Sequence, residues 1–213
     1  MVKSIIFATG AVPKTLGADG EEQFAGAGVS YCATCDGAFF KDKAVAVIGG
    51  GNTAVQDAIY LSKICSKVYL IHRRSEFRAE KHVADGLAAC ANIEPVLNST
   101  VARFIGEGKL SGIVVKNRET GEERELSVSG AFIAVGFAPN NGVFAELVKL
   151  DESGFIRSGE DCKTSRPEIF AAGDCRTKSV RQLVTAGADG GVAAIAACEY
   201  IDSMQNAEKA AES

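Results

Sequence analysis

The sequence predicts an α/β fold, and three features support that prediction. A short apolar run at residues 45–48 is followed by three glycines, an amphipathic helical stretch and a second apolar run at residues 68–71. This is the order of a strand–helix–strand unit. Short strand-like runs separated by glycine turns come next, and an apolar run at residues 131–135 then returns. We therefore expect an antiparallel meander inserted into an α/β domain.

The spacing of apolar residues predicts the individual elements. One apolar helical face runs along residues 52–62, with Asn52 as the expected N-cap, and a second helix is expected at residues 80–90. The expected meander strands are residues 101–105, 110–116 and 123–128. The chain opens on a strand-like run at residues 4–7. The C-terminal third has an expected strand at 169–171, a helix at about 186–200 and a polar tail, 206–213, that we expect to fray.

Composition restricts the classes of function. The 213 residues suffice for one large or two small domains, and no apolar run approaches the ~18 residues of a membrane span. A net charge of −4 argues against a nucleic-acid partner, which selects a basic surface. The seven cysteines are an odd number, in a chain whose start lacks the apolar region of a signal peptide. We therefore expect reduced thiols and a cytoplasmic location.

A dinucleotide-binding pattern follows the first apolar run. The pattern is G-x-G-x-x-G/A, and the residues that fit it are Gly49, Gly50, Gly51, Asn52, Thr53 and Ala54. The pattern alone is weak, but here it ends a predicted strand and opens a predicted helix, which is the context it needs. The first glycine permits a tight turn, the second lets the backbone approach a pyrophosphate, and the helix N-terminus supplies N–H groups. We interpret it as a dinucleotide site rather than a glycine turn that binds nothing.

Arginines follow the second predicted strand, at the position that distinguishes the two nicotinamide nucleotides. An NAD site usually has an acidic residue there, which binds the ribose hydroxyl. This chain has His72, Arg73 and Arg74, with Arg78 four residues further on. Guanidinium groups fit a phosphate, which an acidic residue would repel. The predicted ligand is therefore NADP(H), and a solvated basic turn is the weaker interpretation.

Cys32 and Cys35, in the stretch CATCDG, could form half of a zinc site, a structural disulfide or a redox-active pair. A structural zinc site needs four ligands, and the other five cysteines are isolated in the sequence, so we predict no metal site. The C-x-x-C spacing favours redox chemistry because it lowers a thiol pKa and closes a small, reducible loop. Asp36 could transfer protons or could simply be a turn residue. A dithiol supplied from NADPH needs a flavin as mediator.

Five segments carry a resemblance to a known family, and they read CATCDG, GGGNTA, HRRSEFRA, GDC and RQLVTAGADG. Together they closely resemble the low-molecular-weight thioredoxin reductases of bacteria, a class of pyridine nucleotide-disulfide oxidoreductase. The resemblance runs from residue 5 to about residue 202. It implies that residues 13–135 form a Rossmann-like three-layer NAD(P)-binding domain, into which a β-meander is inserted. It also implies that residues 1–12 and 136–213 are the remnant of a second, FAD-binding Rossmann-like domain.

The resemblance further implies roles for individual residues. Cys32 and Cys35 would form the redox-active disulfide, with Cys35 facing the flavin, Cys32 attacking the partner's disulfide and Asp36 acting as acid and base. The residues implied for NADPH are Gly49, Gly50, Gly51, Asn52 and Thr53 at the pyrophosphate, His72, Arg73, Arg74 and Arg78 around the 2′-phosphate, and Gly136. The residues implied for FAD are Thr9, Gly10, Asp174, Arg181, Gln182 and Leu183.

The sequence departs from the family in one respect. The family has two dinucleotide folds, whereas this chain has one G-x-G-x-x-G/A pattern. The unit that would hold the FAD pyrophosphate spans roughly 30 or more residues and would lie upstream of Thr9 and Gly10. We therefore expect a chain that lacks the N-terminal part of the FAD domain, which weakens the prediction of FAD binding. We also expect poor covering of the apolar residues Val184, Val192, Ile195 and Ile201.

These motifs predict two alternative functions. The first is an NADPH-dependent reductase, expected to be a homodimer without a membrane or nucleic-acid partner, that passes electrons through FAD and the Cys32–Cys35 pair to a separate thioredoxin. The second is a nucleotide-binding fragment that folds around residues 13–135, binds NADPH and shows little turnover. A variant of the first replaces thioredoxin by another dithiol protein, such as one that serves a peroxiredoxin.

Overall fold

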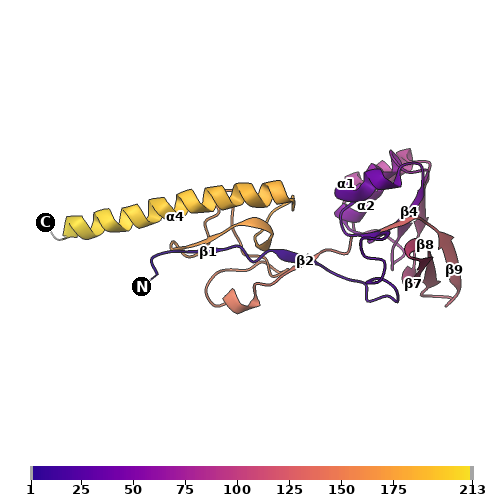
Figure 1. Ribbon diagram of the computed structural model, residues 1–213, viewed down its shortest axis with the longest axis horizontal. Helices are drawn as coiled ribbons and strands as arrows, with labels where there is room; N and C mark the ends of the chain where they lie inside the picture. Colours follow the sequence, from indigo (N-terminus) through magenta and orange to yellow (C-terminus); the bar gives the residue numbers. More distant parts are fainter. Residues whose placement is uncertain (1, 212–213) are drawn as a thin grey trace. The chain divides into compact units, whose positions relative to one another are not determined.

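The computed structural model describes residues 2–211 (Figure 1). The chain forms two compact units: unit 1 comprises residues 1–12 and 137–213, and unit 2 comprises residues 13–136. The chain leaves unit 1 after residue 12 and returns to it at residue 137. Strand β2 (Ala11–Pro13) pairs with β11 (Phe137–Pro139) at these two boundaries. Within residues 2–211, no helix combines the length and the apolar character that a membrane span requires.

A five-stranded parallel sheet forms the centre of unit 2. Its strands, in spatial order, are β3 (Val29–Ser30), β10 (Gly130–Ile133), β4 (Ala44–Ile48), β5 (Lys67–Ile71) and β6 (Ile93–Val96). All four neighbouring pairs are parallel. Parallel neighbours need a crossover connection, and helix α2 (Asn52–Ser62) supplies the one between β4 and β5. The predicted α/β fold is therefore confirmed.

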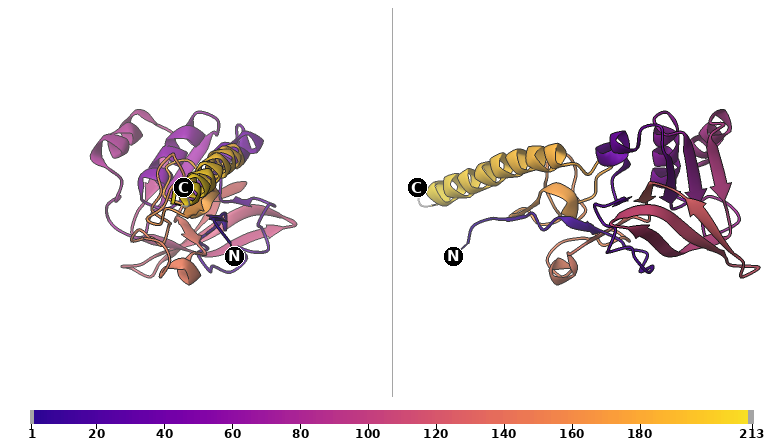
Figure 2. Two further views of the ribbon diagram at one scale, coloured as in Figure 1. Left: turned by 90° about the vertical axis from the view of Figure 1, so that its left-hand side faces the viewer. Right: turned by 45° about the vertical axis from the view of Figure 1, so that its right-hand side comes forward.

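Both faces of this sheet are buried, as strand β4 illustrates. Val45 and Val47 point to the helical side, where they join Leu61 of α2 in one apolar cluster. Ala46 and Ile48 point to the opposite side and pack in a second cluster with the meander. Successive side chains of a strand alternate between faces, so a continuous apolar run is the expected sequence of such a strand. Figure 2 shows the helical layer, the sheet and the meander of unit 2.

The predicted meander covers the face of the sheet opposite the helices. Strands β7 (Ser99–Glu107), β8 (Lys109–Asn117) and β9 (Glu123–Ser127) are joined in that order and pair antiparallel. Gly108 and Gly121 stand in the two connections with φ of +66° and +75°, a conformation that favours glycine. The glycine punctuation of the sequence therefore located both turns correctly.

Two helix predictions need correction. Gly51 rather than Asn52 is the N-cap of α2, and the Asn52 side chain instead pairs with Glu80. Its Oδ1 accepts from the Glu80 backbone N–H at 2.8 Å, and its Nδ2 donates to the Glu80 carboxylate at 2.9 Å. The helix expected at residues 80–90 is only α3 (Lys81–Ala84), followed by a 3-10 helix, Asp85–Ala89. Gly86 lies in this segment, and glycine weakens an α-helix by about 1 kcal/mol relative to alanine.

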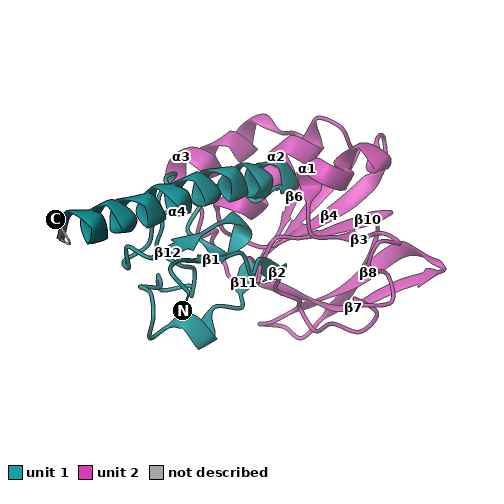
Figure 3. Cartoon of the chain, turned by 60° about the vertical axis from the view of Figure 1, so that its left-hand side comes forward, with its two compact units in different colours: residues 1–12, 137–213 teal, residues 13–136 magenta. Residues whose placement is uncertain are grey.

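Unit 1 is built on a pair of parallel strands, β1 (Ile5–Phe7) and β12 (Ile169–Ala171), and on the long helix α4 (Leu183–Ala211) (Figure 3). Phe170 points toward α4 and packs with Ala193 and Ala196, while Ile169 points to a second cluster with Phe7. Helix α4 is longer than predicted. The expectation that residues 206–211 fray is wrong, and residues 212–213 lie outside the described chain.

Several apolar side chains of unit 1 are exposed to solvent. Val184, Val192 and Ile195 of α4 are exposed, as predicted, whereas Ile201 is half-buried. Ile5 and Ile6 of β1 are exposed as well. The predicted exposure of apolar residues on α4 is thus confirmed for three of the four residues.

Candidate active site and nucleotide-binding cleft

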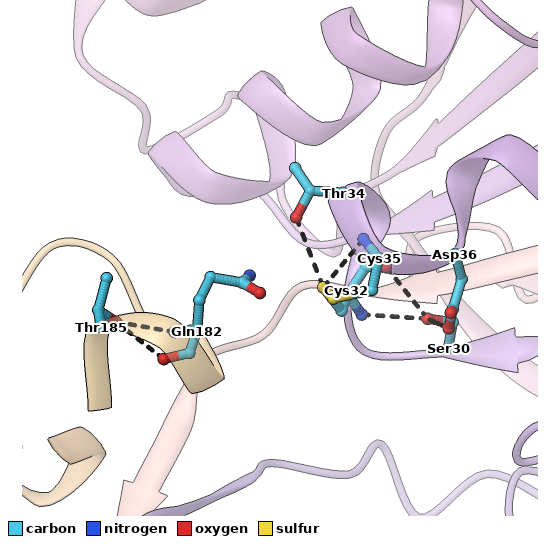
Figure 4. The surroundings of a disulfide bond; sticks show 7 residues. All are labelled: Ser30, Cys32, Thr34, Cys35, Asp36, Gln182 and Thr185. Atoms are coloured by element: carbon cyan, nitrogen blue, oxygen red, sulfur yellow. Dashed lines mark hydrogen bonds between the residues drawn. A yellow bond between two sulfur atoms is a disulfide. The ribbon is translucent and has the colours of Figure 1, made fainter. Parts of the chain in front are cut away.

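The two cysteines of CATCDG lie directly after strand β3 and form a disulfide (Figure 4). Their Cα atoms are 5.3 Å apart. Cys32 is the N-cap of the four-residue helix α1 (Ala33–Asp36), and the Cys35 N–H donates to Cys32 Sγ at 3.2 Å. The Thr34 hydroxyl lies 3.5 Å from the same sulfur. These donors surround Cys32 Sγ, so a thiolate formed there on reduction would be stabilised.

Asp36, the predicted acid and base, ends the same short helix. Its Oδ2 accepts a 2.7 Å hydrogen bond from the hydroxyl of Ser30. The Ser30 Oγ in turn accepts from the backbone N–H of Cys32 at 3.1 Å. Ser30 is a buried polar residue that sequence reasoning missed. The only signal was its position, a hydroxyl residue two places before the first cysteine.

The remaining cysteines differ from this pair. The five free cysteines are Cys65, Cys90, Cys162, Cys175 and Cys198. Burial, with a smaller contribution from Asp42, raises the pKa of Cys65 to about 11, so this thiol is protonated at neutral pH. Among the described residues, no three histidine, cysteine or acidic side chains are grouped as metal ligands. Cys32 and Cys35 therefore differ from the other five cysteines, because they alone form a disulfide among the described residues.

The glycine turn between β4 and α2 has the crowding that the motif predicts. A Cβ on Gly49, whose φ is +155°, would lie 2.4 Å from the Ala134 carbonyl oxygen. A Cβ on Gly50 would lie 2.2 Å from the His72 ring, whereas a Cβ on Gly51 would meet no atom within 4 Å. Gly49 and Gly50 are therefore required by the fold. Gly51 leaves open space at the N-terminus of α2, where a phosphate group could approach the backbone.

His72 follows β5 and lies beneath the glycine turn. The residue is 5% exposed, and its Nε2 is buried without a hydrogen-bond partner among the described residues. Burial, followed by the guanidinium groups of Arg78, Arg74 and Arg73, lowers the pKa of His72. His72 is therefore neutral at pH 7, and its buried Nε2 is a polar atom that a ligand could satisfy.

The three predicted arginines are exposed side chains at the same end of the sheet. The Arg78 N–H donates to the Gly50 carbonyl at 2.7 Å, which ties this arginine to the glycine turn. The Arg74 carbonyl accepts from the Asn98 N–H at 3.0 Å, and the Arg73 carbonyl accepts from Arg118 Nη1 at 3.1 Å. The backbone that carries the arginines is thus fixed, while no salt bridge within residues 2–211 occupies their guanidinium groups.

A cleft of about 520 Å³ in unit 2 brings part of this set together. Of the predicted residues, those that line it are Gly49, Gly50, His72, Arg73 and Arg78. The predicted residues that do not line it are Gly51, Asn52, Thr53, Arg74 and Gly136. The polar lining residues that sequence reasoning missed are Lys14, Thr15, Ser99 and Thr100. They lie far from the motif in sequence and carry no pattern of their own, so no local signal indicated them.

The predicted flavin residues lie in unit 1. Asp174 belongs to a 3-10 helix, Gly173–Cys175, and its Oδ1 is buried without a partner among the described residues. The Arg181 guanidinium lies 4.0 Å from the centre of the Phe155 ring. The Thr9 hydroxyl donates to the Asn141 side chain at 3.0 Å. Gly10 has a φ of +68°. The Gln182 N–H donates to the Thr185 hydroxyl at 3.2 Å, and Leu183 is 90% exposed.

A buried ion cluster fixes the Asp174 segment to helix α4. Asp189 of α4 accepts from Arg176 Nε at 2.8 Å and Nη2 at 2.7 Å, from Lys178 Nζ at 2.8 Å and from the Gly173 N–H at 2.9 Å. The Arg176 side chain is 1% exposed. Hydrogen bonds from Arg176, above all, lower the pKa of Asp189. The cluster was not predicted, because its members are separated in sequence and match no motif.

The geometry agrees with what is found in known proteins. Residues 1–190 match the family model described as pyridine nucleotide-disulphide oxidoreductase. The chain belongs to this family. The thioredoxin reductase of Treponema pallidum (strain Nichols) is 44% identical over 203 residues, which are 95% of this chain and 66% of that protein. The thioredoxin reductase of Listeria innocua is 43% identical, over 98% of this chain and 66% of its own length.

Solved structures give the same assignment. The thioredoxin reductase from Streptococcus pyogenes MGAS5005 matches with a TM-score of 0.87 and 40% identity, over 94% of this chain and 66% of that one. The thioredoxin reductase from Giardia duodenalis matches with a TM-score of 0.88 and 35% identity, over 93% and 66%. The chain thus spans 66% of the length of the curated relatives named above. The predicted resemblance to this family is confirmed.

Proposed function

We propose that the protein is an NADPH-dependent reductase whose Cys32–Cys35 disulfide supplies electrons to a small dithiol protein. One observation supports this most strongly. Unit 2 contains both a disulfide in a C-x-x-C helix and a cleft lined by a glycine turn and arginines. Members of the family with high similarity are named thioredoxin reductases, so we infer that the partner is thioredoxin. We also infer a homodimer located in the cytoplasm.

The residues of unit 2 fit NADPH. Gly50 and Gly51 would approach the pyrophosphate, with Asn52 and Thr53 in the first turn of α2 beside it. Arg73 and Arg78, with Arg74 near them in sequence, would bind a 2′-phosphate. The His72 Nε2, which has no hydrogen-bond partner in the described part of the chain, would hydrogen-bond to the nucleotide. Lys14 adds a further cation to the cleft lining. We also propose Gly136 as a residue of the NADPH site.

The residues of unit 1 fit part of an FAD site. Asp174 offers a buried Oδ1 that has no hydrogen-bond partner within residues 2–211, and it would accept a hydrogen bond from a ribityl hydroxyl. The residues proposed with it are Thr9, Gly10, Arg181, Gln182 and Leu183. When bound, NADPH and FAD supply the two electrons that reduce a disulfide.

The dithiol chemistry would use Cys32, Cys35 and Asp36. Two electrons and two protons convert the disulfide into two thiols. The Cys32 thiolate would attack one sulfur of the partner's disulfide and form a mixed disulfide, while the other partner sulfur leaves and takes up a proton. The Cys35 thiolate would then attack Cys32 Sγ, which restores the intramolecular disulfide and releases the reduced partner. Asp36 would accept and return the proton of the reacting thiol.

A second candidate is NADPH binding without turnover. The presence of one glycine-rich dinucleotide pattern in the chain favours it, since a reductase of this type needs sites for two dinucleotides. A third candidate keeps the reductase but replaces thioredoxin with another dithiol protein, such as one that serves a peroxiredoxin. The same residues of unit 2 would serve it.

Turnover distinguishes these candidates. The full chain would be mixed with FAD, NADPH and oxidised thioredoxin, and NADPH consumption would be followed by absorbance. We expect consumption that needs both FAD and thioredoxin, is lost in Cys35→Ser and persists in the matched control Cys198→Ser, whose cysteine is exposed and outside the disulfide. NADPH binding with no consumption would favour the second candidate. Consumption with a different dithiol protein only would favour the third.

A further inference from the structure

The geometry points to Ser30 as a positioning residue that links the proposed acid–base carboxylate of Asp36 to the backbone of Cys32, the first cysteine of the disulfide. The inference rests on the proposed dithiol function. Ser30 is the last residue of β3 and is 6% exposed. Its backbone belongs to the parallel sheet, where Ser30 is in register with Phe132 of β10. The hydroxyl therefore projects from a residue whose backbone is paired in the sheet.

The hydrogen bonds of Ser30 have an unambiguous direction. The Ser30 hydroxyl donates to Asp36 Oδ2 at 2.7 Å. The alternative acceptor, the Cys32 carbonyl, is 3.4 Å away and competes poorly. The Ser30 oxygen keeps its acceptor capacity and receives the Cys32 N–H at 3.1 Å. One hydroxyl thus connects the carboxylate to the backbone of the first cysteine (Figure 4).

The two hydrogen bonds of the Ser30 hydroxyl restrain the Asp36 carboxylate and the Cys32 backbone, which should move little during proton transfer. An aspartate side chain rotates about two bonds, and proton transfer requires hydrogen-bond reach to the reacting sulfur. The Ser30 hydroxyl fixes the carboxylate orientation, and the same oxygen fixes the start of the CATC segment. Removing the hydroxyl leaves the disulfide chemically intact but lets the carboxylate rotate. A slower thiol–disulfide exchange is the expected consequence.

The experiment measures reduction of the disulfide by dithiothreitol, which requires neither NADPH nor FAD. A dithiothreitol thiolate attacks one cysteine sulfur, the S–S bond breaks, and the leaving sulfur takes up a proton. The second dithiothreitol thiol then displaces the first cysteine and leaves oxidised, cyclic dithiothreitol and two protein thiols. The full chain would be quenched with acid at timed intervals, and its free thiols would be counted by alkylation and mass spectrometry. Failure of NADPH-driven turnover would leave this measurement unaffected.

Two matched pairs of variants isolate the hydroxyl. We expect Ser30→Ala to be reduced about three- to tenfold more slowly than wild type, the range that one lost hydrogen bond allows. Ser62→Ala removes another hydroxyl of unit 2, one that donates to the Ile59 carbonyl, and should leave the rate unchanged. Ser30→Thr and Ser30→Val have nearly the same shape and differ in the hydroxyl. Threonine should retain the wild-type rate, and valine should lose it, so this pair decides the question if alanine fails to fold.

A double-mutant cycle separates positioning from general loosening of the structure. If Ser30 acts through Asp36, Ser30→Ala should have no further effect in an Asp36→Asn background. Positioning also predicts that the rate of Ser30→Ala differs from wild type by a pH-dependent factor, which a loss of stability alone would not produce. The proposal is overturned if Ser30→Thr and Ser30→Val are reduced at equal rates, or if the effects of Ser30→Ala and Asp36→Asn simply multiply.

Discussion

Replacing Asp189 by alanine should selectively weaken unit 1. Asp189 accepts four hydrogen bonds of 2.7–2.9 Å, three of them from the buried cations Arg176 and Lys178. These two side chains are only 1% and 5% exposed, so neither can recover its hydration without movement. The Gly173 N–H, which opens the Asp174 segment, loses its acceptor as well.

The magnitude follows from the burial. Removing one member of a buried ion pair costs about 3–5 kcal/mol, because an uncompensated charge remains in the interior. Glu160 does not replace Asp189, since it lies 3.4 Å from Arg176 Nη2 with a side chain that is 92% exposed. Asp189→Asn retains one acceptor oxygen and should lose less. Glu160→Gln is the matched control and should have little effect.

Hydrogen exchange followed by mass spectrometry measures this loss where it occurs. Peptides from α4 should exchange faster in Asp189→Ala, while those from α2 in unit 2 should be unchanged. The pH dependence has a definite sign. Because the folded pKa of Asp189 is lowered, its contribution is complete above the unfolded value of about 3.9 and is lost as the pH falls toward the folded pKa. Unchanged α4 protection in Asp189→Ala would show that the buried ion cluster does not stabilise unit 1.

Two further predictions concern unit 2. Gly50→Ala places a Cβ 2.2 Å from the His72 ring, so the variant should unfold about 1–3 kcal/mol more easily and bind NADPH more weakly. Gly51→Ala meets open space and should keep the wild-type unfolding midpoint in urea; equal destabilisation of both variants would contradict the crowding argument. Burial raises the pKa of Asp57 to about 6, so the contribution of Asp57 to stability should decrease as the pH rises from about 4 to 6. Asp57→Asn should remove that decrease in urea titrations, and an unchanged pH profile would show that Asp57 is not its source.

The parts of the fold that were predictable are those coded by local pattern. Residues 45–48 and 68–71 are continuous apolar runs, since both faces of a parallel strand are buried, and the structure has β4 and β5 there. The turns at Gly108 and Gly121 were visible because a positive φ favours glycine. The motif predicts that Arg73 and Arg78 lie beside the glycine turn, because its spacing reflects one compact strand–helix–strand unit, and these residues line one cleft.

The parts that were missed depend on contacts between distant residues. Asn52 was expected to cap its own helix, but Glu80, 28 residues away, offers its side chain both a donor and an acceptor. Lys14 reaches the cleft through the fold rather than through a motif. Ser30 is ordinary in sequence and gains its role only when β3 and α1 place its hydroxyl between Cys32 and Asp36.

A comparison of NADPH and NADH binding would test the proposed nucleotide site. Both nucleotides would be titrated into the full chain, with wild type compared to Arg73→Ala, Arg78→Ala and the matched control Arg103→Ala, an exposed arginine of the meander. A hydrogen bond to a charged group contributes about 1.5–3 kcal/mol, so we predict that wild type binds NADPH at least about tenfold more tightly than NADH. The preference should decrease in Arg73→Ala and Arg78→Ala and persist in Arg103→Ala. Equal affinity of wild type for the two nucleotides would contradict the assignment of this cleft to a 2′-phosphorylated dinucleotide.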